Sequence, residues 1–94
     1  MTDAAKDAID AIMVSDTDNV ATCLRDIAAG AAVTIMLGKD RKRLTAADPV
    51  PRGHKLAVRA IAADDSIVKY GEVIGKASAD IGTGNHVHIH NVVD

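Results

Sequence analysis

The sequence predicts a small, mainly β protein with a single domain, and three observations support this prediction. Its 94 residues make one domain, because a single core is the norm at that size. Short apolar runs recur about every ten residues between residues that favour turns, which is typical of all-β proteins. Almost all of the acidic residues are Asp, which favours turns over helix interiors, and Glu72 is the only Glu.

The N-terminal part of the chain allows two interpretations. Residues 1–10 are predicted to form a tail or a short helix, and residues 11–94 to form the β domain. The apolar residues within 3–12 have nearly helical spacing, but 11–15 is equally typical of a strand. Residues 16–19 are predicted to form a turn, because their side chains readily bond their own backbone.

The rest of the chain is predicted to consist of short strands and turns. Residues 38–43 are expected to form a polar loop, because they hold a glycine and four Lys or Arg residues. Pro49 and Pro51 favour an extended segment, since proline fixes φ and has no N–H group to donate. The predicted strands are 20–24, 32–37, 44–47, 54–59, 67–70, 73–77 and 87–92.

An internal repeat predicts a recurrent turn. The pattern Asp-Ile-x-x-Gly-x-x-Val occurs at 26–33 and at 80–87, and a weaker copy occurs at 60–67. We expect a positive φ at the central position of each copy, where glycine is unstrained and aspartate is tolerated. The Ile and Val residues on either side of each turn are expected to face the core.

The composition argues against several classes of function. The net charge is −2 and Tyr70 is the only aromatic residue, so the basic field and stacking rings of nucleic-acid-binding proteins are missing. No apolar run approaches the roughly 20 residues of a membrane helix, and the first residues lack the apolar segment of a secretory signal. Cys23 is the only cysteine, so we expect a cytoplasmic protein in which Cys23 is a buried core residue.

Three of the four histidines lie within the five residues His86-Val-His88-Ile-His90. In a strand these three imidazoles would share one face, and Val87 and Ile89 would face the core. Two neighbouring imidazoles of a strand are close enough to bind one metal ion, with a further ligand from elsewhere. Exposed histidines without a function are the alternative interpretation.

The fourth histidine, His54, precedes Lys55 in a predicted turn. An imidazole and an ammonium group together suit an anionic substrate, whereas a solvated turn is the simpler interpretation. The basic residues at 38–43 likewise suggest either a solvated hairpin end or a surface for an acidic partner.

Several motifs occur in an order that resembles a known family. They are Asp18-Asn19-Val20-Ala21, Arg25-Asp26-Ile-x-x-Gly30, Pro51-x-Gly53-His54-Lys55-x-Ala57, Tyr70-Gly71-x-x-Ile74-Gly75-x-Ala77 and Gly84-x-x-Val87-His88-x-His90-Asn91. Over residues 11–92 the chain resembles the SAF-type N-terminal domain of the altronate/galactarate dehydratase family. This resemblance implies a small, SAF-like β-clip fold, in agreement with the short strands predicted above.

The resemblance also implies lyase chemistry. A proton next to a carboxylate is removed and a β-substituent is lost, with the help of a divalent metal, usually iron(II). Carried over by position, His54, His88 and His90 are expected to be catalytic, His88 and His90 also to bind the metal, and Lys55 and Asn91 to bind the substrate. His86 falls at a variable place in the family motif.

In the sugar-acid dehydratases of this family, a much larger catalytic region follows the SAF-like domain. A free-standing chain of this length resembles the small subunit of (2R)-3-sulfolactate sulfo-lyase. We therefore expect a larger catalytic subunit as partner, a small anionic hydroxy acid as substrate, no activity of the chain alone, and no nucleic-acid or membrane partner. The alternatives are a subunit of an altronate or galactarate dehydratase, a non-catalytic module that binds a hydroxy acid or carbohydrate, and a domain that forms a homo-oligomer.

Overall fold

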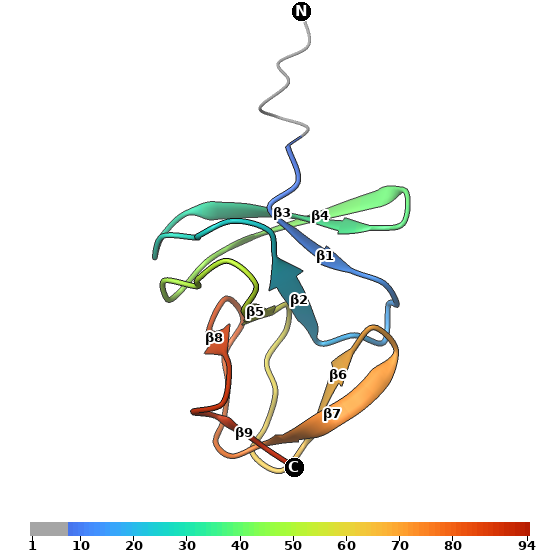
Figure 1. The fold of residues 1–94 in the computed structure, drawn as a ribbon, viewed down its shortest axis with the longest axis vertical. Coiled ribbons are helices and arrows are strands. Elements are labelled where there is room, and N and C mark those ends of the chain that lie inside the picture. The colour runs from blue at the N-terminus through green and yellow to red at the C-terminus, as the bar shows by residue number, and fades with distance from the viewer. Residues whose placement is uncertain (1–7) are drawn as a thin grey trace, which may run out of the picture.

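The computed structural model describes residues 8–94, and all regular secondary structure in this range is β (Figure 1). The prediction of a mainly β fold is therefore confirmed. Most of the segment predicted as a tail or short helix, residues 1–7, lies outside the described residues. Ala11 and Ile12, the last residues of the helix alternative, lie in a strand, Ala11–Met13, instead. No helix of the described part of the chain is long and apolar enough to cross a membrane.

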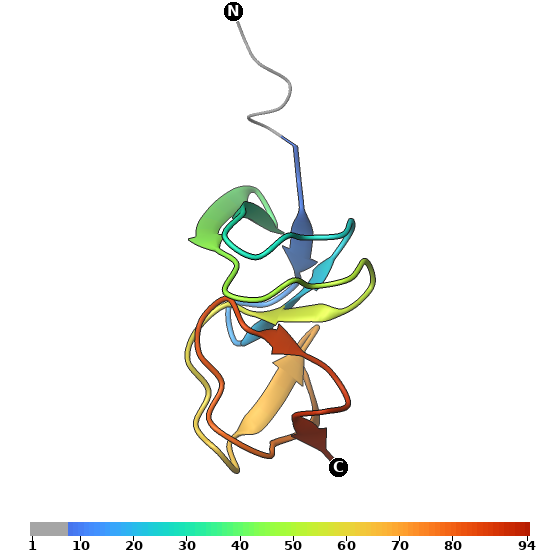
Figure 2. The ribbon, with the colours of Figure 1, turned by 90° about the vertical axis from the view of Figure 1, so that its left-hand side faces the viewer.

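The strands of residues 8–94 form two sheets, which follow one another along the long axis of the molecule (Figure 2). The larger sheet has the order β4-β3-β1-β2-β5-β8, and the smaller sheet the order β6-β7-β9. Neighbouring strands are antiparallel except β1 and β3, which are parallel. The strands are β1 Ala11–Met13, β2 Val20–Cys23, β3 Ala32–Leu37, β4 Asp40–Thr45, β5 Lys55–Ala57, β6 Ser66–Lys69, β7 Glu72–Ala77, β8 His86–Val87 and β9 Val92–Val93.

The middle of the larger sheet separates two apolar cores. Because side chains alternate along a strand, Ala21 of β2 and Leu56 of β5 pack into one core, and their neighbours Val20 and Ala57 pack into the other. Cys23 is buried in the first core, as predicted. Burial raises the pKa of its thiol to about 11, so the thiol is protonated and unreactive at neutral pH.

The structure contains the predicted turns, with positive φ angles of 83° at Gly30, 73° at Asp64 and 86° at Gly84. A fourth copy centres on Gly53, whose φ is 85°. The sequence pattern missed this copy, because Pro49 stands where two of the other copies have Asp. In all four turns the central residue donates its backbone N–H to a backbone carbonyl 2.8 Å away.

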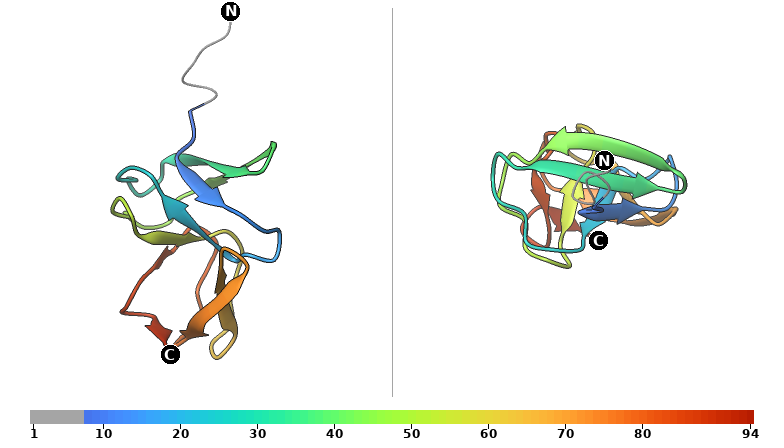
Figure 3. Two further views of the ribbon diagram at one scale, coloured as in Figure 1. Left: turned by 45° about the vertical axis from the view of Figure 1, so that its right-hand side comes forward. Right: turned by 90° about the horizontal axis from the view of Figure 1, so that it is seen from above.

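The four turns associate in pairs. Ile27 and Val50 exchange two backbone hydrogen bonds, and Ile61 and Ile81 do the same in the other pair. The loops of the first pair lie side by side at one edge of the molecule (Figure 3, left). All four side chains are buried, so each turn adds one apolar residue to a core.

Gly84 is the turn residue with the least space. A Cβ atom there would lie 2.9 Å from the backbone nitrogen of Ala47 and would collide with the carbonyl oxygen of Thr45. Gly30, at the equivalent position of another turn, has a similar φ but nothing within 4 Å of an added Cβ. We expect Gly84→Ala to lower the free energy of unfolding by about 2–4 kcal/mol, since it combines backbone strain with a clash.

Gly30→Ala is the matched control for this prediction and is expected to cost only about 1–2 kcal/mol, because it adds strain without a clash. Urea unfolding of both variants measures the two losses. Equal losses would contradict the importance of the close approach at Gly84.

Two predicted elements are wrong. Residues 38–43 are not a loop, because the chain turns at Gly38 and Lys39 and then forms β4, which pairs with β3 along its whole length (Figure 3, right). The polarity of β4 reflects its place at the edge of the sheet, where charged side chains discourage pairing with other proteins. Residues 87–92 are not one strand either, because β8 ends at Val87 and a turn precedes β9.

Two consecutive residues join the sheets. The buried Asp18 carboxylate accepts backbone hydrogen bonds from Val14 and Ser15 beside it and from Gly71 in the β6–β7 turn. The side chain of Asn19 accepts the N–H of Val68 and donates to a β6 carbonyl, so it pairs with the edge of β6 as a strand would. The predicted turn at 16–19 therefore also links distant parts of the chain.

Candidate functional site

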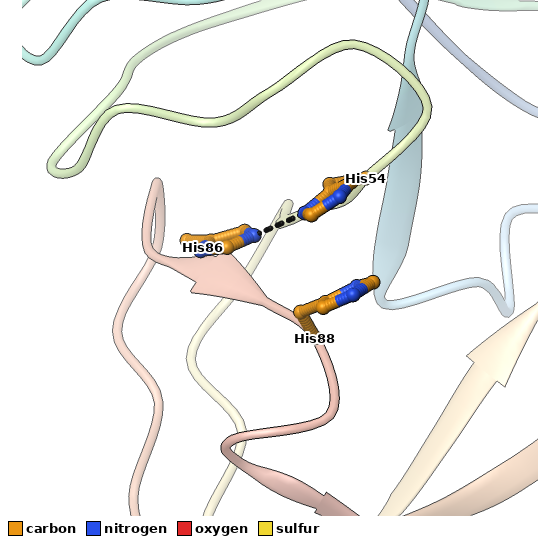
Figure 4. A group of neighbouring side chains, drawn as sticks. All are labelled: His54, His86 and His88. Atoms are coloured by element: carbon orange, nitrogen blue, oxygen red, sulfur yellow. Dashed lines mark hydrogen bonds between the residues drawn. The ribbon is translucent and has the colours of Figure 1, made fainter.

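Three histidines from distant parts of the chain meet beside β8 (Figure 4). His54 lies just before β5, His86 is the first residue of β8, and His88 follows β8. Their ligand nitrogens, one per ring, all lie within 4.8 Å of one another. We call His54, His86 and His88 the histidine cluster.

The rings of the histidine cluster are in direct contact. Nδ1 of His54 lies 2.8 Å from Nε2 of His86, so one of these nitrogens carries the proton that the other accepts. The ring of His88 stacks on that of His54, with centroids 3.8 Å apart and an interplanar angle of 10°. All three side chains are half-buried.

The backbone of two turns brings these rings together. The positive φ of Gly53 directs the chain into β5, and β5 pairs with β8 so that Leu56 lies opposite His86. His54 and His86 are therefore diagonal neighbours on one face of the sheet. The chain leaves the sheet after Val87, but His88 remains against His54.

Two side chains hold the backbone of this segment. The Asp48 carboxylate accepts the backbone N–H of His86 and a side-chain N–H of Asn85, both at 3.0 Å. Asn91 accepts the backbone N–H of His88 and donates to the carbonyl oxygen of His86, both at 2.9 Å. Both polar atoms of the Asn91 amide thus bond to the backbone that carries the histidines.

The remaining predicted site residues lie at the margin of the histidine cluster. His90 is exposed, and its ring lies 5.0 Å from that of His86. Lys55 is half-buried and lies near His88, because its charge contributes to lowering the pKa of that imidazole. The structure thus places His86 in the cluster and His90 at its edge, whereas the sequence motif favoured His90 over His86.

The electrostatic environment of the site is predominantly positive. Burial, and then the charge of Lys69, lower the pKa of Lys55. Burial and the neighbouring imidazoles also lower the pKa values of His86 and His88, which favours neutral rings near pH 7. The hydrogen bond from the backbone of His86 keeps the pKa of Asp48 below its usual value, so a carboxylate balances part of this charge.

This arrangement has two chemical capabilities. Neutral imidazoles can accept a proton from a substrate or coordinate a transition metal. An ammonium group beside them can bind a carboxylate or sulfonate. Both suit an acid–base reaction on a small anion.

Comparison with known proteins identifies the domain. A sequence model of the altronate/galactarate dehydratase SAF domain matches residues 9–94. The chain belongs to this family. Its matched region includes both sheets and the whole histidine cluster, so the site described above is a feature of a SAF domain.

Three relatives show how this SAF domain occurs elsewhere. Altronate dehydratase of Bacillus subtilis (strain 168) is 44% identical over 80 residues, which cover 85% of this chain but 15% of that protein. Galactarate dehydratase (L-threo-forming) of Escherichia coli (strain K12) is 38% identical over 82 residues, 87% of this chain and 15% of that protein. (2R)-Sulfolactate sulfo-lyase subunit alpha of Paracoccus pantotrophus is 51% identical over 49 residues, 52% of this chain and 73% of that subunit.

Asp48 was not among the predicted site residues, and Asn91, which was predicted to bind substrate, bonds the backbone of His86 and His88 in the structure. Asp48 is separated from His86 by 38 positions, and an Asp before a proline indicates only a turn. Val87 and Asn91 are four residues apart, and nothing in the sequence between them indicated that the chain turns there. The repeat places Lys55 and His86 at equivalent positions, two residues after the positive φ of their turns, but only the structure shows that β5 and β8 pair.

Proposed function

We propose that this SAF domain is the small subunit of a metal-dependent lyase that removes sulfite from (2R)-sulfolactate and leaves pyruvate. The observation that carries the proposal is the similarity to sulfo-lyase subunit alpha, which extends over 73% of that subunit. The histidine cluster and Lys55 supply the acid–base and anion-binding groups that such an elimination needs. A larger subunit would supply the rest of the active site, and the cytoplasm is the compartment we propose.

The proposed reaction is a β-elimination. An imidazole, His88 or His90, removes the proton from C2 next to the carboxylate. The electron pair of that bond forms a double bond between C2 and C3, while the C3–S bond breaks and sulfite leaves with its electrons. The resulting enol of pyruvate then takes up a proton on C3 and loses the proton of its C2 hydroxyl, which gives pyruvate.

The surrounding residues would stabilise the charge that develops. Lys55 would bind the carboxylate of the substrate, where negative charge accumulates as the C2 proton leaves. A bound divalent metal, iron(II) in this proposal, would act as a Lewis acid towards the same charge. Asn91, which we had expected to contact substrate, would hold the turn that carries His88.

Co-purification and an assay test this proposal. The tagged chain is expressed in its native cell, and proteins that co-purify with it are identified and assayed with sulfolactate, altronate and galactarate. We expect a stoichiometric larger chain and release of sulfite from sulfolactate. Release of water from altronate or galactarate instead would establish the second candidate, a sugar-acid dehydratase, which the 44% identity to altronate dehydratase favours. Recovery of this chain alone, without turnover of any of the three substrates, would contradict both candidates. The remaining candidate would then be a non-catalytic binding module.

Ile89 is a further test of the partner subunit. It lies in the turn beside the histidine cluster and is 84% exposed, the highest value among the large apolar side chains of the described residues. A partner that completes the active site would cover it, and a charge in a covered apolar contact is costly. We expect Ile89→Asp to weaken association with the larger chain by about 10-fold or more.

Val73→Asp is the matched control, because Val73 is 64% exposed and lies on the β6–β7 hairpin away from β8 (Figure 1). It is expected to leave association unchanged, as measured by quantitative co-purification. Equal recovery of the larger chain with both variants would show that the partner does not dock over the His88–Asn91 turn.

A further inference from the structure

The histidine cluster has nitrogens whose hydrogen-bonding capacity is not satisfied within the described residues. Nδ1 of His88 is buried and has no hydrogen-bond partner there. His54 and His86 direct ring nitrogens at each other at 2.8 Å, an arrangement that leaves room for one proton between them. Buried polar atoms without a partner are rare in proteins and are often explained by a bound ion or water.

From this geometry we infer that the chain itself holds a divalent transition metal through one ring nitrogen each of His54, His86 and His88. The inference deepens the proposed function and rests on it for the role of the metal, although not for the existence of the site. It differs from the expectation drawn from the family motif, in which His88 and His90 were the ligands. With His88 bound to the ion, His90 is left as the imidazole for proton transfer.

The positions of the rings suit an ion after a small rearrangement. Nitrogens bound to one tetrahedral ion at about 2.1 Å lie about 3.4 Å apart. The 2.8 Å contact between His54 and His86 must therefore lengthen slightly, and the stacked ring of His88 must rotate about its side-chain bonds. One nitrogen of each ring already lies within 4.8 Å of those of the other two, and we expect rotation about the side-chain bonds to close the remaining difference.

The backbone of two ligands is held in place by other side chains. Asp48 bonds the N–H of His86, and Asn91 bonds both the carbonyl of His86 and the N–H of His88. Such supporting residues set the orientation of metal ligands, and their loss costs about 10–100-fold in affinity. We therefore assign Asn91 as a positioning residue of this site.

The ligand set selects a class of metal. Three imidazoles without a carboxylate favour iron(II), cobalt(II), nickel(II), copper(II) or zinc(II) over magnesium and calcium, which prefer oxygen ligands. Three protein ligands leave at least one coordination position open. A hydroxy acid could bind there through its oxygen atoms, next to Lys55.

Metal titration of the full chain without any partner tests the inference. Cobalt(II) is titrated with visible absorption as the readout, and zinc(II) by calorimetry and thermal unfolding. We expect one ion per chain, and at a hundredfold excess over Kd a rise in Tm of about 10 °C or more. His54→Ala, His86→Ala and His88→Ala should each weaken binding by more than about 100-fold, and Asn91→Ala by about 10–100-fold with an altered cobalt spectrum.

His90→Ala is the discriminating variant, because it lies beside the cluster and should leave the affinity for both ions unchanged. Loss of binding in His90→Ala with full binding in His54→Ala would overturn the inference in favour of the His88–His90 pair. Absence of one-to-one binding to the folded native chain would overturn it altogether. Lyase activity of the assembled enzyme without metal binding by this chain would refute the inference alone, whereas binding without lyase activity would refute the proposed function alone.

Discussion

Replacing His88 with alanine is expected to lower turnover of the assembled lyase by about 100-fold or more, the usual effect of losing a general acid or base. His88 stacks on His54 with centroids 3.8 Å apart and has a buried nitrogen, so its ring is central to the site. The loss is expected in kcat, because either role proposed for His88, proton transfer or metal binding, acts on the transition state.

His90→Ala is made in parallel and is expected to lower kcat by a similar factor if His90 transfers the proton. Both enzymes are assayed for sulfite release in the presence of the larger subunit, with and without excess iron(II). If excess metal partly restores the kcat of His88→Ala, His88 is a metal ligand. If excess metal does not restore the kcat of His90→Ala, His90 is an acid–base group. Turnover close to that of the native enzyme in both variants would remove these histidines from the mechanism.

Asp18→Ala is expected to lower the free energy of unfolding by about 3–5 kcal/mol, because it leaves several backbone N–H groups without an acceptor. Asp18 is fully buried and accepts hydrogen bonds from Gly71 at 2.7 Å, Val14 at 2.9 Å and Ser15 at 3.1 Å. It lies where the two sheets meet, so its loss frees the β6–β7 turn as well as the local turn. Asp18→Asn keeps an acceptor oxygen and should cost less.

The same residue makes stability depend on pH. Burial alone would raise the pKa of Asp18, but hydrogen bonds from the backbone N–H groups of Gly71, Val14, Ser15 and Tyr70 outweigh it and hold the pKa below the usual value. A carboxylate with a lowered pKa stabilises the fold above its unfolded pKa of about 4, and this contribution is lost as the pH falls through the lower folded value. Urea unfolding should therefore show a difference between native protein and Asp18→Ala that is constant near pH 7 and shrinks in acid. A difference that is independent of pH would contradict this account.

Much of the fold could be predicted because local rules determine it. The turns at Gly30, Asp64 and Gly84 were recognisable from residues that tolerate positive φ, and most strands from their apolar runs. β4 could not be recognised, because an edge strand exposes its side chains and needs no apolar face. The break after Val87 was hidden for a related reason, since alternation of His with apolar residues continues through a turn in which the Asn91 side chain replaces the sheet hydrogen bonds.

The candidate site was predictable in its residue types but not in its assembly. The density of histidines at 86–90 pointed to chemistry, and His54 was singled out independently. That these meet depends on pairing between β5 and β8, which the sequence does not reveal. Asp48 illustrates the same limit, because a turn residue gains its role from a partner far along the chain.

The four equivalent turns give the domain an approximate internal symmetry that its chemistry does not share. The residue directly after the positive φ is His54 in one turn and Asn85, followed by His86, in another, whereas the same position holds Ala31 and Asp65 in the remaining two. The residue with positive φ donates its main-chain N–H to a carbonyl in all four turns, so this shared bond does not depend on which side chain follows, although Asn85 adds a side-chain bond to the N–H of Gly82. One turn can therefore acquire or lose a reactive group during evolution while the others preserve the scaffold.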